Sequence, residues 1–417
     1  MYRFIIKGGK ELSGKVKVSG SKNAALPLIA ASLLAKGRTI LHNVPDLKDI
    51  QTMLKVVHTL GPIFHFENNK IIIDTTHIKS HVAPYELVKT MRASIYVLGP
   101  LLARVGKAKV SLPGGCAIGP RPINFHIEAM KKLGARISIK EGFVHARTSK
   151  LKGAEIYFEK VSVGATANVL MASVLARGKT VIKDAALEPE IGNLITFLKK
   201  MGADIQGKDT DTIIVNGVDN LKPVEYTVIP DRIEAGTFIL AGVITRSNIT
   251  VENIHPTHIR SLIDVLERMN IKLKVTDDSV KIRSCSDIRP IDIKTAPYPG
   301  FPTDLQPQLG AVLAAVPGIS VINETIFENR YTHVPELIRM GSDIDVEDHI
   351  AIIRGKKRLT GAPVMASDLR GGAALVLAAL AAKGESVIQR VYHIDRGYEK
   401  IESKLKNLGA RIERVKN

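Results

Sequence analysis

Apolar and polar residues follow a pattern that recurs six times along the chain. Each repeat begins with a segment that is apolar at almost every position and rich in alanine and leucine, which is typical of a helix buried on all sides. A short strand-like segment, a loop and a second helix with one apolar face follow. The six apolar segments are residues 24–35, 92–103, 165–176, 234–244, 306–316 and 373–382.

The second helix of each repeat is expected to end at a glycine or asparagine, because these residues readily adopt the left-handed backbone found after helix C-termini. These anchor residues are Gly61, Gly134, Gly202, Asn270, Gly341 and Gly409. Their spacings are 73, 68, 68, 71 and 68 residues, which indicates six copies of one repeat. Alternating segments after the anchors, such as ARISI and FVHAR, predict a pair of strands.

The two ends of the chain indicate how the repeats are grouped. Repeats one to five close with a further strand that leads into the next apolar segment, but the sixth stops after ARIERVKN. Residues 1–20 hold two strand-like segments, YRFII and GKVKVSGS, and we expect them to form a strand pair that completes the sixth repeat. The expected domains are residues 21–229, and residues 1–20 plus 230–417, with three repeats in each.

The charge balance favours an anionic partner. The chain has 59 basic and 41 acidic side chains, a net charge of +18. Nucleic acid is a poor candidate, because the chain has no Trp, only 5% aromatic residues for base stacking, and no basic run denser than GKKR. Small anions are the better expectation, and a merely basic, solvated surface is the alternative.

Several classes of protein are disfavoured by the sequence. No apolar run reaches the roughly 18 residues that a membrane span needs, and the start MYRFIIKGGK lacks a signal-peptide apolar region, so a cytoplasmic protein is expected. Two cysteines cannot build a disulfide framework or a cysteine-rich metal site. We find no metal-ligand cluster, phosphate-binding P-loop or dinucleotide fingerprint, so neither a metal nor a cofactor is expected.

The segment PGGCAIGPRP, residues 113–122, suits a reactive cysteine. Its glycines let the backbone move or approach a ligand, and Arg121 near Cys116 favours a thiolate. The alternative is a glycine turn with an incidental thiol. Cys285, on a predicted strand, has no comparable setting and is expected to be structural.

Charged residues at the start of the apolar helices form a second group of candidates. Ser and Asp are good N-caps, and capping is a sufficient explanation for Asp231. Capping does not explain Lys22, Arg92 or Arg370, because a positive charge at a helix N-terminus is unfavourable unless an anion or a carboxylate offsets it.

The chain resembles the enolpyruvyl transferases over its whole length. The resemblance rests on the six-repeat plan and on the motifs SGSKNAALP, RAS, LPGGCAIGPRP, EKVSVGAT, PGFPTDLQPQ, ETIFENR, DLRGGAALV and IDRGYE. It implies an α/β fold, namely a two-domain inside-out α/β barrel built from six repeated units with buried helices and outer sheets. It also implies transfer of the enolpyruvyl group of phosphoenolpyruvate to the 3'-hydroxyl of UDP-N-acetylglucosamine, the first committed step of peptidoglycan synthesis.

The resemblance also assigns catalytic roles. Cys116 matches a general acid that can add covalently to phosphoenolpyruvate and that fosfomycin attacks, and Asp304 matches the carboxylate that takes the sugar hydroxyl proton. The residues that match phosphoenolpyruvate-binding positions are Lys22, Asn23, Arg121 and Arg396, and the resemblance also implies that Lys22 and Arg396 are catalytic.

The nucleotide sugar has its own matching positions. They are Asn23, Arg92, Arg121, Pro122, Ile123, Asn124, Phe125, Lys160, Val161, Ser162, Val163, Asp304 and Ile326. Asp368 and Arg370 match a pair that lines the cleft, and we expect them to neutralise each other. Asn124 stands where the family often has Asp, near the uracil, and Pro120 stiffens the loop before Arg121.

Two other functions stay open at this point. One is enolpyruvyl transfer to another acceptor such as shikimate 3-phosphate, although the sequences of that sister enzyme lack the GGCAIGPRP loop. The other is a non-catalytic anion-binding paralogue, against which the presence of Lys22, Cys116, Asp304 and Arg396 together argues. A monomer is expected.

Overall fold

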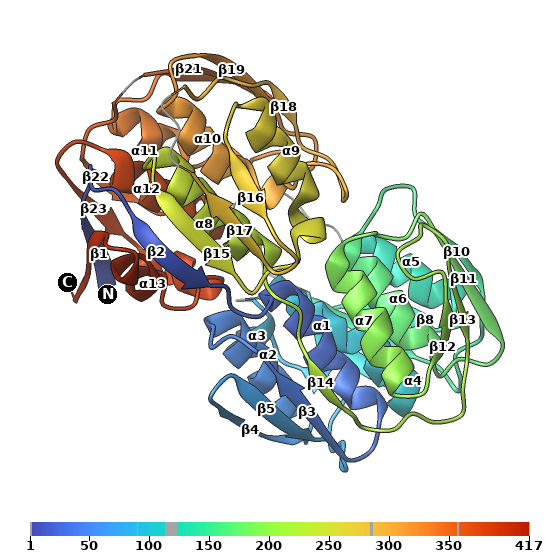
Figure 1. Cartoon of the computed structure of the whole chain (residues 1–417). Coiled ribbons are helices and arrows are strands. Elements are labelled where there is room, and N and C mark those ends of the chain that lie inside the picture. The colour runs from blue at the N-terminus through green and yellow to red at the C-terminus, as the bar shows by residue number, and fades with distance from the viewer. Residues whose placement is uncertain (1, 90, 113–122, 284–286, 357, 417) are drawn as a thin grey trace. The chain divides into compact units, whose positions relative to one another are not determined.

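The computed structural model describes residues 2–89, 91–112, 123–283, 287–356 and 358–416 (Figure 1). Contacts divide these residues into two compact units. The middle unit contains residues 20–112 and 123–229, and the terminal unit contains residues 2–19 and 230–416 apart from the undescribed positions. Each unit has a hydrophobic core of its own.

The middle unit contains three four-stranded sheets, with strand orders β14-β3-β5-β4, β6-β7-β9-β8 and β10-β11-β13-β12. The first strand of each order runs parallel to its neighbour, and the other pairs are antiparallel. The strands are β3 (Arg38–His42), β4 (Ile63–Glu67), β5 (Lys70–Asp74), β6 (Val82–Ala83), β7 (Lys107–Ser111), β8 (Arg136–Lys140), β9 (Phe143–Arg147), β10 (Glu155–Tyr157), β11 (Lys179–Lys183), β12 (Asp204–Gln206), β13 (Ile213–Asn216) and β14 (Glu225–Thr227). The helices are α1 (Lys22–Ala31), η1 (Ser32–Leu34), α2 (Lys48–Thr59), α3 (Tyr85–Val88), η2 (Arg92–Val97), α4 (Leu98–Val105), α5 (Asn124–Lys132), α6 (Val163–Ser173) and α7 (Pro189–Lys200).

The terminal unit repeats this plan, with sheets β16-β17-β15-β2, β18-β19-β21-β20 and β22-β23-β1-β24. The strands are β1 (Tyr2–Lys7), β2 (Ser13–Lys17), β15 (Asn248–Glu252), β16 (Leu273–Val275), β17 (Ser279–Ile282), β18 (Ile293–Lys294), β19 (Gly318–Asn323), β20 (Ile344–Glu347), β21 (Ile350–Gly355), β22 (Pro363–Met365), β23 (Glu385–Gln389) and β24 (Arg411–Lys416). The helices are α8 (Arg232–Ile244), η3 (Pro256–Ile259), α9 (Arg260–Arg268), η4 (Thr303–Leu305), α10 (Gln306–Ala314), α11 (Val334–Arg339), α12 (Leu369–Ala381), η5 (Val391–Arg396) and α13 (Ile401–Asn407).

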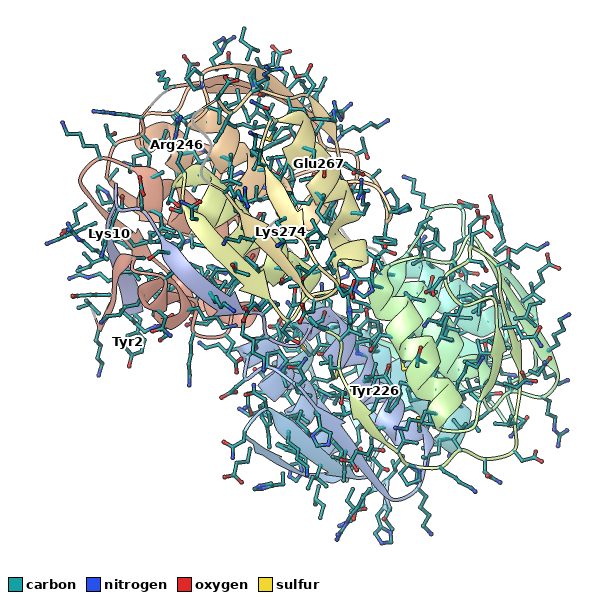
Figure 2. The ribbon with its side chains drawn as sticks, viewed as in Figure 1. Tyr2, Lys10, Tyr226, Arg246, Glu267 and Lys274 are labelled. Carbon is teal, nitrogen blue, oxygen red and sulfur yellow. The ribbon has the colours of Figure 1, made fainter. Side chains whose placement is uncertain are left out.

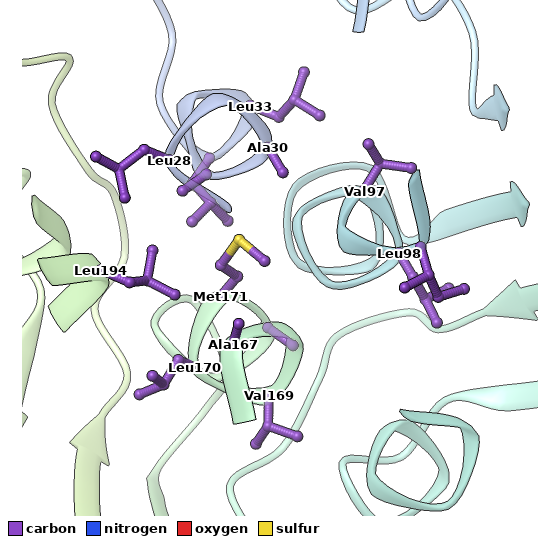
Figure 3. Packing of buried hydrophobic residues seen from close by; sticks show 14 of the residues in the cluster. Leu28, Ala30, Leu33, Val97, Leu98, Ala167, Val169, Leu170, Met171 and Leu194 are labelled. Atoms are coloured by element: carbon purple, nitrogen blue, oxygen red, sulfur yellow. The ribbon is translucent and has the colours of Figure 1, made fainter. Parts of the chain in front are cut away.

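The apolar segments form the buried helices that the sequence predicts. Every residue of α8 after Arg232 is buried, and so is every residue of α10. In the middle unit, side chains of α1, α4 and α6 interlock around Met171 (Figure 3). Small residues permit this packing, since a Cβ added at Gly99 of α4 would lie 2.5 Å from the Asn168 carbonyl oxygen of α6.

The two N-terminal segments are strands, but they do not pair with each other. Strand β1 pairs antiparallel with both β23 and β24, so it lies inside the sheet of the sixth repeat. Strand β2 pairs parallel with β15 and so belongs to the sheet of the fourth repeat. The predicted strand pair was therefore wrong, because residues 8–12 carry the chain from one sheet of the terminal unit to the next.

No helix in the described part of the chain combines the length and the apolar character that a membrane crossing requires. Basic side chains are spread over the outside of both units, with Lys10 and Lys274 among the exposed ones (Figure 2).

Candidate functional site

A cluster of four charged side chains lies at the helix starts of the terminal unit. Its centre is Asp304 in the 3₁₀ turn η4, directly before α10. Arg370, in the first turn of α12, donates from Nε and Nη2 to Asp304 Oδ2 at 3.2 and 2.9 Å. Arg330 Nη2 donates to Asp304 Oδ1 at 3.2 Å. Two guanidinium groups therefore hold the two oxygens of one carboxylate, which fixes its orientation.

Arg330 anchors this cluster to the backbone. Its side chain is only 2% exposed, and its Nε and Nη2 donate to the carbonyl oxygen of Thr303 at 3.1 and 3.0 Å. Its Nη1 lies 3.8 Å from Asp368 Oδ1. Arg330 stands in the motif ETIFENR, but it is not among the predicted site residues. No local sequence signal identifies Arg330, because its importance follows from its burial, and a buried charge requires partners.

Asp368 caps α12 and does not pair with the Arg370 side chain as expected. Asp368 Oδ1 accepts from the backbone N–H groups of Arg370 and Gly371 at 2.9 and 3.1 Å. Burial acts to raise the pKa of Asp368, but Arg330 and these N–H groups outweigh burial and lower it. Burial acts to lower the pKa of Arg370, but the Asp304 carboxylate outweighs it and raises the pKa. The expected neutralisation thus occurs across the cluster, with Arg370 paired to Asp304.

Two further predicted residues lie on elements joined to this cluster. Glu324 Oε1 accepts from the backbone N–H of Ile326 at 2.8 Å, and its Oε2 accepts from Thr303 Oγ1 at 3.0 Å, so the turn with Ile326 is tied to η4. Arg396 is the last residue of η5 and is partly exposed. A Cβ at Gly397 would lie 2.7 Å from the Leu369 side chain, so the glycine lets the end of η5 pack against the start of α12.

In the middle unit, Lys22 is the first residue of α1 and is buried. Its Nζ lies 3.0 Å from Oδ2 of Asp49, which is also buried, in α2. A carboxylate therefore offsets the positive charge at the helix N-terminus. Asp49 carries no sequence signal of this role, because it stands in an ordinary amphipathic helix. Asn23, the next residue of α1, is partly exposed.

A buried network joins the segments that carry the predicted nucleotide-sugar residues. Arg92 begins η2, and Asn124 begins α5, which also carries His126. His126 Nδ1 lies 2.9 Å from Asn168 Nδ2 in α6, and Asn168 Nδ2 also donates to the carbonyl oxygen of Ile95 at 3.0 Å. Burial, together with the charge of Arg92, lowers the pKa of His126 to about 3, so this imidazole is neutral at pH 7.

The start of α6 belongs to the same assembly. Ser162 caps this helix, its Oγ accepting from the Ala165 N–H at 3.3 Å, and Val163 is the first helical residue. A Cβ at Gly164 would lie 3.2 Å from the His126 ring, so any side chain there would require the ring to shift by a few tenths of an ångström. Within the middle unit these contacts join η2 with the starts of α5 and α6, which carry Arg92, Asn124 and Val163. Lys160 and Val161 are exposed just before the cap of α6.

Three predicted site residues, Cys116, Arg121 and Pro122, lie outside the described residues, as do Pro120 and Cys285. Among the residues that the structure does describe, no group of three or more His, Cys, Asp or Glu side chains is arranged to hold a metal ion.

Comparison with known proteins identifies the family. A family model described as EPSP synthase (3-phosphoshikimate 1-carboxyvinyltransferase) matches residues 6–405. Proteins named UDP-N-acetylglucosamine 1-carboxyvinyltransferase from Geobacter metallireducens and Acinetobacter guillouiae are each 51% identical, over 100% of this chain and 100% of theirs.

Two solved structures share the fold. The enolpyruvyl transferase NikO from Streptomyces tendae matches with a TM-score of 0.90 and 26% identity over 99% of both chains. An EPSP synthase from Acinetobacter baumannii matches with a TM-score of 0.77 and 18% identity over 100% of both chains, a likeness of fold alone. The expected fold class is confirmed. The chain belongs to the enolpyruvyl transferase family that the EPSP synthase model describes, and its full-length relatives in that family are UDP-N-acetylglucosamine 1-carboxyvinyltransferases.

Proposed function

We propose that this protein transfers the enolpyruvyl group of phosphoenolpyruvate to the 3'-hydroxyl of UDP-N-acetylglucosamine and releases phosphate. The single observation that carries the proposal is identity of 51% over the full length of proteins named for this activity. The sequence identity to the solved EPSP synthase structure is only 18%, so this similarity supports the fold alone. Shikimate 3-phosphate is therefore a weaker candidate acceptor than UDP-N-acetylglucosamine.

The reaction is an addition followed by an elimination. In the addition, the 3'-oxygen bonds to the central carbon of phosphoenolpyruvate, the hydroxyl proton passes to a base, and the methylene carbon gains a proton from an acid. In the elimination, the new methyl group loses a proton and the C–O bond to phosphate breaks. Each step needs one proton donor and one proton acceptor within reach of the reacting atoms.

We assign the base to Asp304. The two guanidinium groups hold both of its carboxylate oxygens in place, with 29% of the side chain exposed. We propose that this carboxylate accepts the proton as the new C–O bond forms, when the sugar hydroxyl becomes more acidic. Because the two arginines fix the position of the Asp304 carboxylate, the reaction avoids the entropy cost of orienting a mobile base toward the hydroxyl.

Cys116 is the proposed acid and the site of a covalent adduct. A thiol has an ordinary pKa of about 8.5, so at pH 7 it is mostly protonated and can still exchange a proton. Lys22, Asn23, Arg121 and Arg396 are the proposed ligands of the phosphate and carboxylate of phosphoenolpyruvate. The buried Lys22 carries a fixed charge at a helix start, where its partner Asp49 holds it in one position.

The proposed nucleotide-sugar residues fall mostly in the middle unit. Arg92 and Lys160 supply positive charge for the diphosphate, and the α6 N-terminus at Ser162 and Val163 adds its helix dipole. Asn124, exposed at the start of α5, offers an amide to the uracil. The remaining proposed ligands are Asn23, Arg121, Pro122, Ile123, Phe125, Val161, Asp304 and Ile326, and the proposed lining pair is Asp368 and Arg370.

This activity would place the protein in the cytoplasm, at the start of peptidoglycan synthesis, and so link it to cell shape, cell division and the cell cycle. We further propose that it acts as a monomer, without a cofactor, and that fosfomycin inactivates it through Cys116. The proposed domains are residues 21–229, and residues 1–20 plus 230–417.

Phosphate release tests the proposal. The protein is incubated with phosphoenolpyruvate in metal-free buffer, and phosphate is measured with UDP-N-acetylglucosamine, with shikimate 3-phosphate and without an acceptor. We expect release only with the nucleotide sugar. Release only with shikimate 3-phosphate would make the alternative acceptor the correct one. No release with either acceptor, from a protein that still binds both ligands, would indicate a non-catalytic paralogue.

A further inference from the structure

Tyr398 connects three buried helices of the terminal unit to the charged cluster. It follows η5 by two residues and is only 1% exposed. Its hydroxyl lies 3.0 Å from Thr237 Oγ1 in α8 and accepts from Gln308 Nε2 in α10 at 3.0 Å. Gln308 Nε2 also lies 3.2 Å from Thr237 Oγ1, so the three side chains form one closed network.

The Tyr398 ring makes the third connection, to α12. The guanidinium carbon of Arg370 lies 5.4 Å from the ring centroid, within the range of a cation–π contact. Arg370 Nε and Nη2 donate to Asp304, whereas Arg370 Nη1 is buried and has no hydrogen-bond partner among the described residues. The Tyr398 ring is therefore a further contact of the Arg370 guanidinium, besides its hydrogen bonds to Asp304.

We propose that Tyr398 is a positioning residue for the transfer reaction, one that acts through Arg370 on the orientation of Asp304. The hydroxyl network holds the ring against α8 and α10, the ring holds the Arg370 guanidinium, and that guanidinium holds Asp304 Oδ2. Tyr398 is also tied to η5 by its backbone, since its N–H donates to the carbonyl oxygen of Ile394 at 3.1 Å. This inference rests on the proposed function.

Graded variants separate the ring from the hydroxyl. Tyr398→Phe keeps the ring and loses the hydroxyl network, and we expect kcat to fall by about threefold to fivefold. Tyr398→Leu loses the ring as well, and we expect kcat to fall by about 20-fold or more, with KM for UDP-N-acetylglucosamine changed by less than about threefold. A side chain that only fills the core would lower the melting temperature without this graded loss of kcat.

The decisive measurement is a double-mutant cycle that combines Tyr398→Phe with Arg370→Lys. This cycle does not need the Tyr398→Leu variant, so it can be carried out even if that variant fails to fold. If Tyr398 acts through Arg370, Tyr398→Phe lowers kcat by less than about 1.5-fold once Arg370 is lysine. Independent, multiplying effects of the two substitutions would overturn the proposal.

Tyr226→Phe in the middle unit is the matched control. Tyr226, labelled in Figure 2, is half-buried, and its hydroxyl donates to Asn193 Oδ1 at 3.1 Å. We expect this variant to lose stability but to keep kcat within about 1.5-fold of wild type. If the wild type is active and the Tyr398 variants have the same kcat, this inference alone is refuted. A wild type that transfers to neither acceptor would refute the proposed function, and this inference with it.

Discussion

Replacing Asp304 with asparagine separates its chemical role from its structural one. Asparagine has the same shape but cannot accept the hydroxyl proton, and loss of a general base lowers kcat by about 10²- to 10⁴-fold. That loss corresponds to about 2.7–5.4 kcal/mol in the activation free energy. Both substrates should still bind, because the side chain still fills its place.

The structural cost of Asp304→Asn can be estimated from its contacts. The carboxylate accepts three hydrogen bonds from two buried arginines, at 2.9, 3.2 and 3.2 Å. Bonds to charged groups contribute about 1.5–3 kcal/mol each, but the amide keeps one acceptor oxygen, and the side chain is 29% exposed, so water replaces part of the loss. A net loss of about 2–3 kcal/mol is expected, a fall of about 4–12 °C in melting temperature. A domain stable by about 5–15 kcal/mol remains folded at 25 °C.

The assay is steady-state phosphate release together with calorimetric binding of each substrate. Asp231→Asn is the control, because Asp231 Oδ1 caps α8 by accepting from the N–H groups of Ile233 and Glu234 at 2.8 and 3.0 Å. Asparagine is an equally good cap, so turnover within about threefold of wild type is expected for this control. If Asp304→Asn also kept turnover within about threefold, Asp304 would be a structural residue and another base would be needed.

Three further predictions concern acid stability, the thiol and the buried lysine. His126 has a pKa of about 3 in the folded state and 6.5 in the unfolded state, so between these values the unfolded state binds the extra proton and stability decreases as the pH is lowered. We expect the middle unit to lose about 2 kcal/mol of stability between pH 7 and pH 5, measured by denaturant unfolding. An equal loss in the His126→Gln variant would contradict this. Cys116→Ser should lower turnover by about 100-fold or more, because a hydroxyl is a far weaker acid than a thiol, whereas Cys116→Asp should keep activity and resist fosfomycin. Wild-type turnover in the serine variant would exclude the proton-donor role. Lys22→Gln should raise KM for phosphoenolpyruvate and lower stability by about 3–5 kcal/mol, because it breaks the buried pair with Asp49. The double variant Lys22→Gln/Asp49→Asn should recover stability in thermal melts but should keep the raised KM in steady-state kinetics.

The repeats could be predicted from sequence because burial constrains composition directly. A helix that packs on all sides must be apolar on all sides, and α8 and α10 meet this condition along nearly their whole length. The pairing of β1 and β2 could not be predicted in the same way. Both segments alternate, and the partners of β2 lie 235 residues further along the chain, from Asn248 to Glu252. Alternation indicates a strand but does not specify its neighbour.

The charged cluster was only partly predictable for a similar reason. Asp304 and Arg370 each stood out at a helix start, but they are 66 residues apart, and their pairing depends on how α10 and α12 pack. Arg330 and Asp49 carry charges that are ordinary in a sequence and become significant only when the fold buries them. Pairing between distant charges is a property of tertiary packing, whereas the position of a charge at a helix start is visible locally.

The proposed addition and elimination are tested most directly by carrying out the reaction in deuterium oxide. Phosphoenolpyruvate and UDP-N-acetylglucosamine are incubated with the protein, and the nucleotide-sugar product is analysed by mass spectrometry and proton NMR. We expect an enolpyruvyl ether at the 3'-oxygen, one phosphate released for each ether formed, and deuterium in its vinyl methylene group, because the intermediate methyl group takes up one solvent deuteron before it loses a proton. An ether without deuterium, or phosphate release without any ether, would contradict the proposed reaction.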